Sequence, residues 1–347
     1  METWPGDLLE SVKEILWSQW AALGACLSVM PARLSVIDPE ALVVSTCAFG
    51  RSDARLFDES MDWISLNHRL LKPWRLKRIA RAFGPEVQTT LGAVLDYVSV
   101  ALGKDLFSGV RREAGAGLDS AASEVLFLSE SRSRYSDAVN ANPVFQRWGL
   151  LRGTPRMRGH SGKPDLENPA NLMLRLRDHY GNATRADVMT YLITADGGSS
   201  NAIASRLKYN QKGVYDALEQ MYGSGFVHKY GGVNSAHYWL DRADLAPGLG
   251  LEGELPAFFV WSDIYYSFFL VVSDYLENRK AYESDFLSIE RMRDLTVKVL
   301  PLLRNAGQAL SRLSVPDVKR QSGTEHKDNL VDYLIRVLDV LRESTLG

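Results

Sequence analysis

The run of residues 182–240 constrains the fold more than any other part of this 347-residue chain, because capping residues, apolar stripes and glycines follow one another in a definite order. A capping residue begins each of three apolar helical patterns, namely Thr184, Ser200 and Asn210. The apolar residues recur at three- and four-residue spacings, as on the buried face of a helix. They are Val188, Tyr191, Leu192, Ile203, Leu207, Val214, Leu218 and Met221. We therefore predict three short helices around one small core.

The hydrophobic period changes from about 3.6 to 2 directly after the third of these helices. Gly223 and Gly225 end that helix. Residues 226–230 and 236–240 then alternate as strands do, and residues 231–235 form a tight loop between them. The pattern predicts a β-hairpin immediately after three helices.

This order of elements resembles the winged helix-turn-helix of bacterial MarR- and ArsR-type regulators. The matching parts are Ala202–Leu207, Asn210–Tyr222, Gly225–Val227 and the hairpin that ends at Leu240. The resemblance covers about 60 residues and depends on the order of the elements rather than on any single residue. It implies a third helix that enters the major groove of duplex DNA, with the hairpin as the wing.

The expected DNA-facing side of the third helix lies opposite its apolar stripe. Its polar residues are Asn210, Gln211 and Lys212, and Tyr215 lies beside them. Asn and Gln can bind adenine edges, and Lys can reach guanine or phosphate. The turn and the wing complete the expected DNA-binding set with Arg206, Lys208, Tyr209, Lys229 and His237. Asp216, on or near the same face, is unfavourable beside phosphate.

The remainder of the chain is expected to be helical, so the predicted fold class is mainly α, with a small β-hairpin. Apolar stripes predict helices within residues 8–20, 88–102, 257–278, 284–313 and 329–342. Pro301 is expected to kink or break the fourth of these. Glycines and prolines are frequent in residues 152–169 and 247–253, which predicts two joints. The expected parts are an N-terminal helical domain (1–150), a basic linker (151–169), a winged helix-turn-helix (170–245) and a C-terminal helical domain (254–347).

Positive charge is concentrated in the middle third of the chain, although the whole chain carries a net charge of −2. Residues 145–245 hold 13 Lys/Arg against 9 Asp/Glu, whereas both flanking segments are net acidic. Five of these basic residues precede any acid, namely Arg147, Arg152, Arg156, Arg158 and Lys163. Two interpretations stay open for them: an electrostatic footprint for phosphate, or a solvated linker.

Two weaker motifs lie in the N-terminal region. The acids Asp58, Glu59 and Asp62 superficially resemble a nucleotidyltransferase site, but Asp58 and Asp62 have a helical spacing rather than the D-x-D spacing that Mg²⁺ binding on a strand needs. The helix expected after Pro73 buries Leu76, Ile79 and Phe83 and exposes four basic residues, Arg75, Lys77, Arg78 and Arg81. It is interpreted as an ordinary amphipathic helix, or as part of a second DNA-binding-like unit.

Other features restrict the class of protein. Neither Cys26 nor Cys47 has a metal-ligand spacing, and the six scattered histidines form no helical metal motif, so no metal, cofactor or catalytic residue is expected. Residues 1–14 lack the pattern of a signal peptide. The most apolar stretch, residues 255–272, is interrupted by Asp263 and is expected to be a core helix rather than a membrane span. A cytoplasmic protein is expected.

The sequence predicts a transcriptional regulator that binds double-stranded DNA sequence-specifically. It is expected to be a homodimer whose subunits contact each other through their C-terminal helices. Aromatic residues from Phe258 to Phe269 are expected to form core, a subunit interface or the wall of a pocket for an unknown small-molecule effector; a protein effector is the alternative. A protein-interaction scaffold built on a winged helix is the alternative function, and a nucleotidyltransferase-like enzyme is a weaker one.

Overall fold

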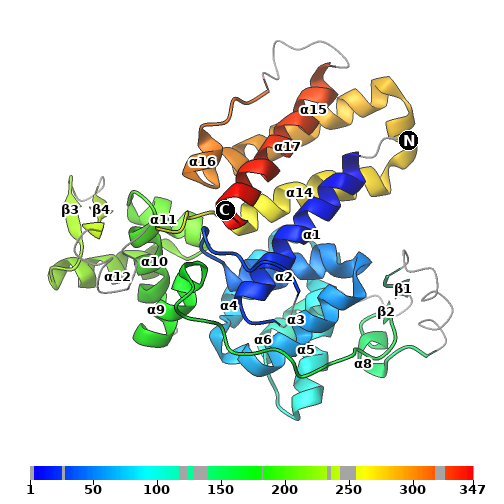
Figure 1. Ribbon diagram of the computed structural model, residues 1–347, viewed down its shortest axis with the longest axis horizontal. Coiled ribbons are helices and arrows are strands. Elements are labelled where there is room, and N and C mark those ends of the chain that lie inside the picture. The colour runs from blue at the N-terminus through cyan, green and yellow to red at the C-terminus, as the bar shows by residue number, and fades with distance from the viewer. Residues whose placement is uncertain are drawn as a thin grey trace. The chain divides into compact units, whose positions relative to one another are not determined.

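The computed structural model describes residues 4–25, 28–116, 123–127, 140–181, 183–232, 236–242, 255–316 and 325–346. These residues are mainly helical (Figure 1), as the sequence predicts. Their strands form two two-stranded sheets, of which β1–β2 is parallel and β3–β4 is antiparallel. Among the described helices, none combines the length and the apolar character that a membrane span requires.

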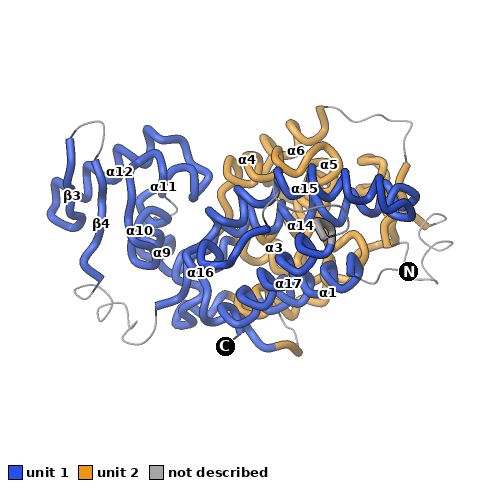
Figure 2. The backbone as a smooth tube through the Cα atoms, turned by 90° about the horizontal axis from the view of Figure 1, so that it is seen from above, with its two compact units in different colours: residues 1–18, 30–38, 164–347 blue, residues 19–29, 39–163 orange. Residues whose placement is uncertain are grey.

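The chain forms two compact units, and neither is continuous in sequence (Figure 2). Unit 1 comprises residues 1–18, 30–38 and 164–347. Unit 2 comprises residues 19–29 and 39–163. This division differs from the expected domains, because most of the first helix belongs to unit 1 and because the two C-terminal domains of the prediction lie in one unit.

Unit 2 is built around one helix without an exposed side. Its elements are α2 (Pro39–Phe49), η1 (Gly50–Ser52), α3 (Ala54–Asn67), η2 (His68–Leu70), α4 (Pro73–Phe83), α5 (Pro85–Leu102), α6 (Ser108–Ala114), β1 (Glu124–Val125), α8 (Pro143–Gln146) and β2 (Leu150–Leu151). All eleven residues of α2 are buried. A helix that is buried on every side lies inside a core, so α2 is the centre of this unit.

The one ionised side chain of α2, Glu40, holds the start of α4. Its Oε1 accepts a hydrogen bond from the backbone N–H of Lys72 at 2.8 Å, and its Oε2 lies 2.5 Å from Nη1 of Arg75. Arg75 is therefore buried, whereas the sequence predicted an exposed residue at this position. The predicted burial of Leu76, Ile79 and Phe83 is confirmed. In this buried ion pair Glu40 and Arg75 compensate each other's charge, because either charge alone would be costly inside the core.

Residues 152–163 are not a free linker, because they are hydrogen-bonded along α3 within unit 2. Asp58 accepts from Nη2 of Arg152 at 2.6 Å and from the backbone N–H of Arg156 at 2.9 Å. Asp62 accepts from the backbone N–H groups of Gly159 and Ser161 at 2.9 and 3.0 Å. Two of the three acids that resembled a nucleotidyltransferase motif, Asp58 and Asp62, thus anchor this segment.

The basic stretch is correspondingly occupied. Arg152 is buried, and its guanidinium lies 5.0 Å from the ring centroids of both Phe127 and Phe145. Arg147 pairs with Asp96 at 3.1 Å. The side chain of Arg152 is therefore not available to a phosphate, whereas Arg147 is 62% exposed and its ion pair lies at the surface.

Cys47 provides a reporter for the integrity of unit 2. The side chain lies in α2, and burial raises its pKa to about 12, with a smaller opposite effect of the Arg51 charge. Because the thiolate is the reactive form, we expect Cys47 to resist iodoacetamide in the native protein at about pH 8 and to be alkylated once the protein unfolds. Mass spectrometry of the peptide that contains Cys47 measures this difference. Native alkylation at the rate of a free thiol would contradict the burial of α2.

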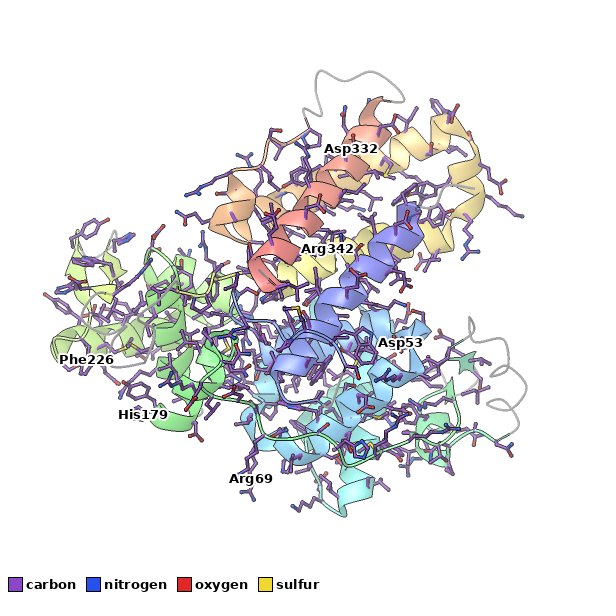
Figure 3. All side chains as sticks on the ribbon, in the orientation of Figure 1. Asp53, Arg69, His179, Phe226, Asp332 and Arg342 are labelled. Carbon is purple, nitrogen blue, oxygen red and sulfur yellow. The ribbon has the colours of Figure 1, made fainter. Side chains whose placement is uncertain are left out.

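Unit 1 contains the other helices and the antiparallel hairpin. Its elements are the part of α1 (Trp4–Ala22) up to residue 18, η3 (Pro169–Asn171), α9 (Leu172–Tyr180), α10 (Thr184–Thr194), α11 (Ser200–Leu207), α12 (Gln211–Gly223), β3 (His228–Tyr230), β4 (His237–Trp239), α14 (Trp261–Glu277), η5 (Arg279–Glu283), α15 (Asp285–Asn305), α16 (Gln308–Ser311) and α17 (Glu325–Leu346). Its first and last helices lie together: Arg342 of α17 (Figure 3) donates to Ser11 at 2.7 Å and to Glu14 at 2.8 Å.

The long helices predicted from apolar stripes are present, with one difference. Of the kink or break expected at Pro301 in residues 284–313, the break does not occur, because α15 continues through Pro301 to Asn305. The helix instead ends ahead of Gly307, where an added Cβ would lie 2.5 Å from Cδ1 of Phe259. Pro301 has no backbone N–H, so the carbonyl of Val297 lacks its usual helical partner at this point.

Candidate nucleic-acid interface

The α10–β4 segment, Thr184–Trp239, has the order of elements that the sequence predicts, with small shifts at two helix starts. The helix cap expected at Thr184 is absent, because Thr184 is the first residue of α10 and Ala183 precedes it without a side-chain cap. Ser199, not Ser200, caps α11 by accepting from the N–H of Ala202 at 3.2 Å. Asn210 caps α12 as predicted, accepting from the N–H of Gly213 at 2.7 Å.

The three helices and the hairpin share one core. All the apolar residues predicted to face it are buried, and Leu172 and Leu176 of α9 join them. The hairpin pairs His228 with Trp239 and Tyr230 with His237. Residues 233–235 of the predicted loop lie outside the described residues.

A third segment, which the sequence pattern did not predict, pairs with this hairpin. Gly198 exchanges two backbone hydrogen bonds with Tyr238, at 3.0 and 2.9 Å. Gly197 precedes it with φ of +80°, and an added Cβ would lie 2.3 Å from the carbonyl oxygen of Tyr238. The glycine pair is thus required where the chain passes close to β4. The pairing fixes the hairpin against the start of α11.

A buried charged network holds Tyr209, which directly precedes the Asn210 cap of α12. Asp187 of α10 accepts from Nε and Nη2 of Arg177 at 2.8 and 2.9 Å and from the hydroxyl of Tyr209 at 2.6 Å. All three side chains are buried. Tyr209, which the sequence placed in the DNA-binding set, therefore faces the core and is a positioning residue for the turn between α11 and α12.

The exposed side of α12 is the side predicted to face DNA. Asn210, Gln211, Lys212 and Tyr215 are exposed, and so is Asp216. The amide of Gln211 donates to the hydroxyl of Ser200 at 2.9 Å, which joins the first turns of α11 and α12. Neither Lys212 nor Asp216 has an ion-pair partner among the described residues. This face combines one cation and one acid with two amides and one aromatic ring.

Two lysines that were predicted to contact phosphate form ion pairs with carboxylates of the same chain. Nζ of Lys208 lies 2.6 Å from Oδ1 of Asp263, in the first turn of α14. Nζ of Lys229 lies 2.6 Å from Oε1 of Glu219. The bond from Lys229 is the main cause that lowers the pKa of Glu219, and the bond to Glu219 raises the pKa of Lys229. Each lysine would have to leave its partner to reach a phosphate.

The other two predicted contacts turn toward a cleft rather than toward the exposed side of α12. Arg206 is half-buried and donates to the hydroxyl of Tyr191 at 3.3 Å. His237 is half-buried and stacks on Tyr230 with ring centroids 4.9 Å apart. Both side chains line a cavity that is described below. The nine predicted residues therefore do not form one surface: four share the exposed side of α12, and five do not.

Exposed aromatic side chains on the same segment were not predicted as a site. Phe226 is 52% exposed, Tyr230 59% and Trp239 37%. His228 stacks on Trp239 with ring centroids 4.3 Å apart. The aromatic alternation of the two strands was visible in the sequence, but it was used only to predict the hairpin.

No protein-family model, curated protein or solved structure matches this chain. In the part of the chain that the structure describes, no three His, Cys, Asp or Glu side chains are grouped so as to hold a metal ion. The geometry of the α10–β4 segment is therefore the basis on which a function is assigned.

Proposed function

We propose that the α10–β4 segment is a winged helix-turn-helix and that the protein uses it to bind duplex DNA sequence-specifically, as a transcriptional regulator. The observation that carries the proposal is the exposed start of α12, where Asn210, Gln211, Lys212 and Tyr215 lie opposite the buried stripe. A helix that presents such side chains beyond a tight turn fits the major groove. The amides and the ammonium group supply base-edge and phosphate contacts.

Rigidity around this helix also supports the proposal. Three contacts hold the first turn of α12: the Asn210 cap, the bond from Gln211 to Ser200 and the buried Asp187 network. A base-reading side chain needs such support, because a misplaced donor loses its bidentate geometry. A dimer would place two copies of α12 on half-sites one helical turn apart, as regulators of this kind require.

DNA binding is tested by titrating the protein with duplexes from upstream of its own gene at two salt concentrations. We expect affinity to fall steeply as salt rises, because phosphate contacts release counterions. Lys212→Glu should weaken binding at least about tenfold and reduce the salt slope by about 1. Lys280→Glu is the matched control, since it makes the same charge change at an exposed lysine outside the α10–β4 segment. Absence of binding at low salt, or equal effects of the two variants, would overturn the proposal.

A protein-interaction scaffold is the second candidate, and the exposed aromatic residues favour it. A groove of about 420 Å³ lies between α10 and the end of α12, lined by Tyr180, Met189, Met221 and Phe226 among others. Phe226 projects at the outer edge of the segment in Figure 3. If the Phe226→Ser variant keeps its affinity for DNA but no longer supports regulation in the cell, the scaffold is favoured.

A further inference from the structure

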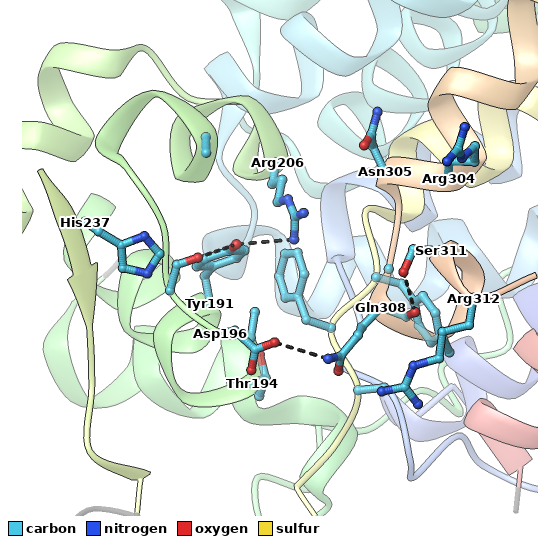
Figure 4. A pocket seen from close by; sticks show the side chains of 18 residues that line it. Tyr191, Thr194, Asp196, Arg206, His237, Arg304, Asn305, Gln308, Ser311 and Arg312 are labelled. Carbon is cyan, nitrogen blue, oxygen red and sulfur yellow. Dashed lines mark hydrogen bonds between the residues drawn. The ribbon is translucent and has the colours of Figure 1, made fainter. Parts of the chain in front are cut away.

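We propose that a cleft in unit 1 binds a small anionic ligand that carries a planar ring, of the nucleotide class. The cleft has a volume of about 470 Å³, within the range of small-molecule sites. Its walls come from α10 and α11 on one side and from the segment 257–259 with the α15–α16 region on the other (Figure 4). Both walls belong to unit 1.

The cleft is rich in guanidinium groups without carboxylate partners. Arg206 lines one wall, and Arg304 and Arg312 line the other. None of the three has an ion-pair partner among the described residues, although carboxylates pair with several other arginines of the chain. Guanidinium groups bind phosphate through charge-assisted and often bidentate hydrogen bonds. Arg206 is half-buried and Arg304 and Arg312 are exposed, so the positive charge around the cleft favours an anion.

Among the described residues that line the cleft, Asp196 is the one acid, and it has a basic partner of its own. Asp196 lies 3.0 Å from Nη2 of Arg242 and accepts from the amide of Gln308 at 3.2 Å. Three arginines therefore line the cleft against one acid, which itself pairs with a fourth arginine. This leaves the cleft cationic at neutral pH.

Aromatic groups in the floor of the cleft select a ligand with a ring rather than a bare phosphate. Tyr191 and Phe258 meet edge to face with centroids 5.0 Å apart, and Arg206 lies over the Tyr191 ring at 5.9 Å. Phe258 is only partly buried, so part of its ring is open to the cleft. A ligand whose planar ring packs against Phe258 and whose phosphates face the arginines matches both the aromatic and the basic lining of the cleft.

The position of the cleft has a consequence for regulation. The same ligand would contact Arg206 in the α10–β4 segment and Arg304 or Arg312 beyond it, so binding would favour one arrangement of these two parts over others. This regulatory role rests on the DNA-binding function proposed above. The ligand site itself does not.

The site is tested on the full chain with ATP as the probe, by calorimetric titration at low salt and without DNA. ATP is expected to bind, adenosine to bind more weakly, and inorganic pyrophosphate to bind between the two. Arg304→Ala and Arg312→Ala should each raise the Kd for ATP about tenfold, equivalent to about 1.4 kcal/mol. Arg293→Ala, an exposed arginine of α15 outside the cleft, is the matched control and should leave the Kd unchanged.

A second variant addresses the aromatic floor. Phe258→Leu keeps an apolar side chain at this position, and should lower the affinity for ATP while leaving that for pyrophosphate unchanged. Absence of ATP binding, or an unchanged Kd in the Arg304→Ala Arg312→Ala double variant, would overturn the site. If the double variant loses affinity for DNA while the wild type does not bind ATP, the arginines serve duplex phosphate instead. If the protein binds ATP but does not bind DNA, the proposal of the ligand site is supported and only the proposed DNA-binding function is refuted.

Discussion

Replacing Asp187 with alanine is expected to lower the free energy of unfolding of unit 1 by about 3–5 kcal/mol. The substitution leaves the guanidinium of Arg177 buried without the carboxylate that lies 2.8 Å from its Nε. It also removes the acceptor of the Tyr209 hydroxyl. An uncompensated buried charge costs far more than the same charge in water. Denaturant titration followed by circular dichroism measures the change.

Asp216→Ala is the matched control for this substitution. Asp216 is exposed on α12, so the same chemical change there should alter the free energy of unfolding by no more than about 0.5 kcal/mol. Similar losses in the two variants would show that Asp187 does not carry the buried network. In the Asp187 variant the start of α12 also loses its support, so DNA affinity should fall even where the protein remains folded.

Glu40→Ala is expected to have an effect of similar size in unit 2, about 3–5 kcal/mol. Glu40 and Arg75 are both buried, with the ion pair at 2.5 Å, and Glu40 also accepts from the N–H of Lys72. The variant would leave a buried guanidinium and weaken the start of α4 together. We expect Cys47 to become reactive at a lower denaturant concentration, which reports on unit 2 separately from unit 1.

The comparison for Glu40 is Glu86→Ala in the same unit. Glu86 pairs with Arg51 at 3.2 Å, but its side chain is half exposed. Exposed ion pairs contribute about 1 kcal/mol or less, so Glu86→Ala should cost little. A Glu40 variant as stable as the Glu86 variant would contradict the role of the buried pair.

Periodic patterns predicted most helices and the core of the α10–β4 segment, because those patterns arise from local geometry. The helix starts were less accurate. Ser199 and Ser200 are both good capping residues, and the pairing of Gly198 with Tyr238, 40 residues away, holds Ser199 in the extended conformation that a cap needs. A sequence without its tertiary contacts does not distinguish the two serines.

The predicted site was less accurate than the fold because charges find their partners across long sequence separations. Lys208 pairs with Asp263 and Tyr209 bonds to Asp187, and neither contact follows from helical or strand spacing. One signal was available for the second contact: Asp187 lies between Ala186 and Val188 on a buried helix face. A charged residue at such a position needs a buried partner.

The interleaved units also determine the order in which the protein can be completed during synthesis. Every residue of unit 2 has been made once the ribosome passes residue 163. Unit 1 begins earlier but closes last, because the backbone N–H of Arg33 bonds to the carbonyl of Thr345 at 2.9 Å and Ser35 bonds to the Thr345 hydroxyl at 3.2 Å. Residues 30–38 therefore gain these bonds only once α17 has been made, whereas every residue of unit 2 is present long before.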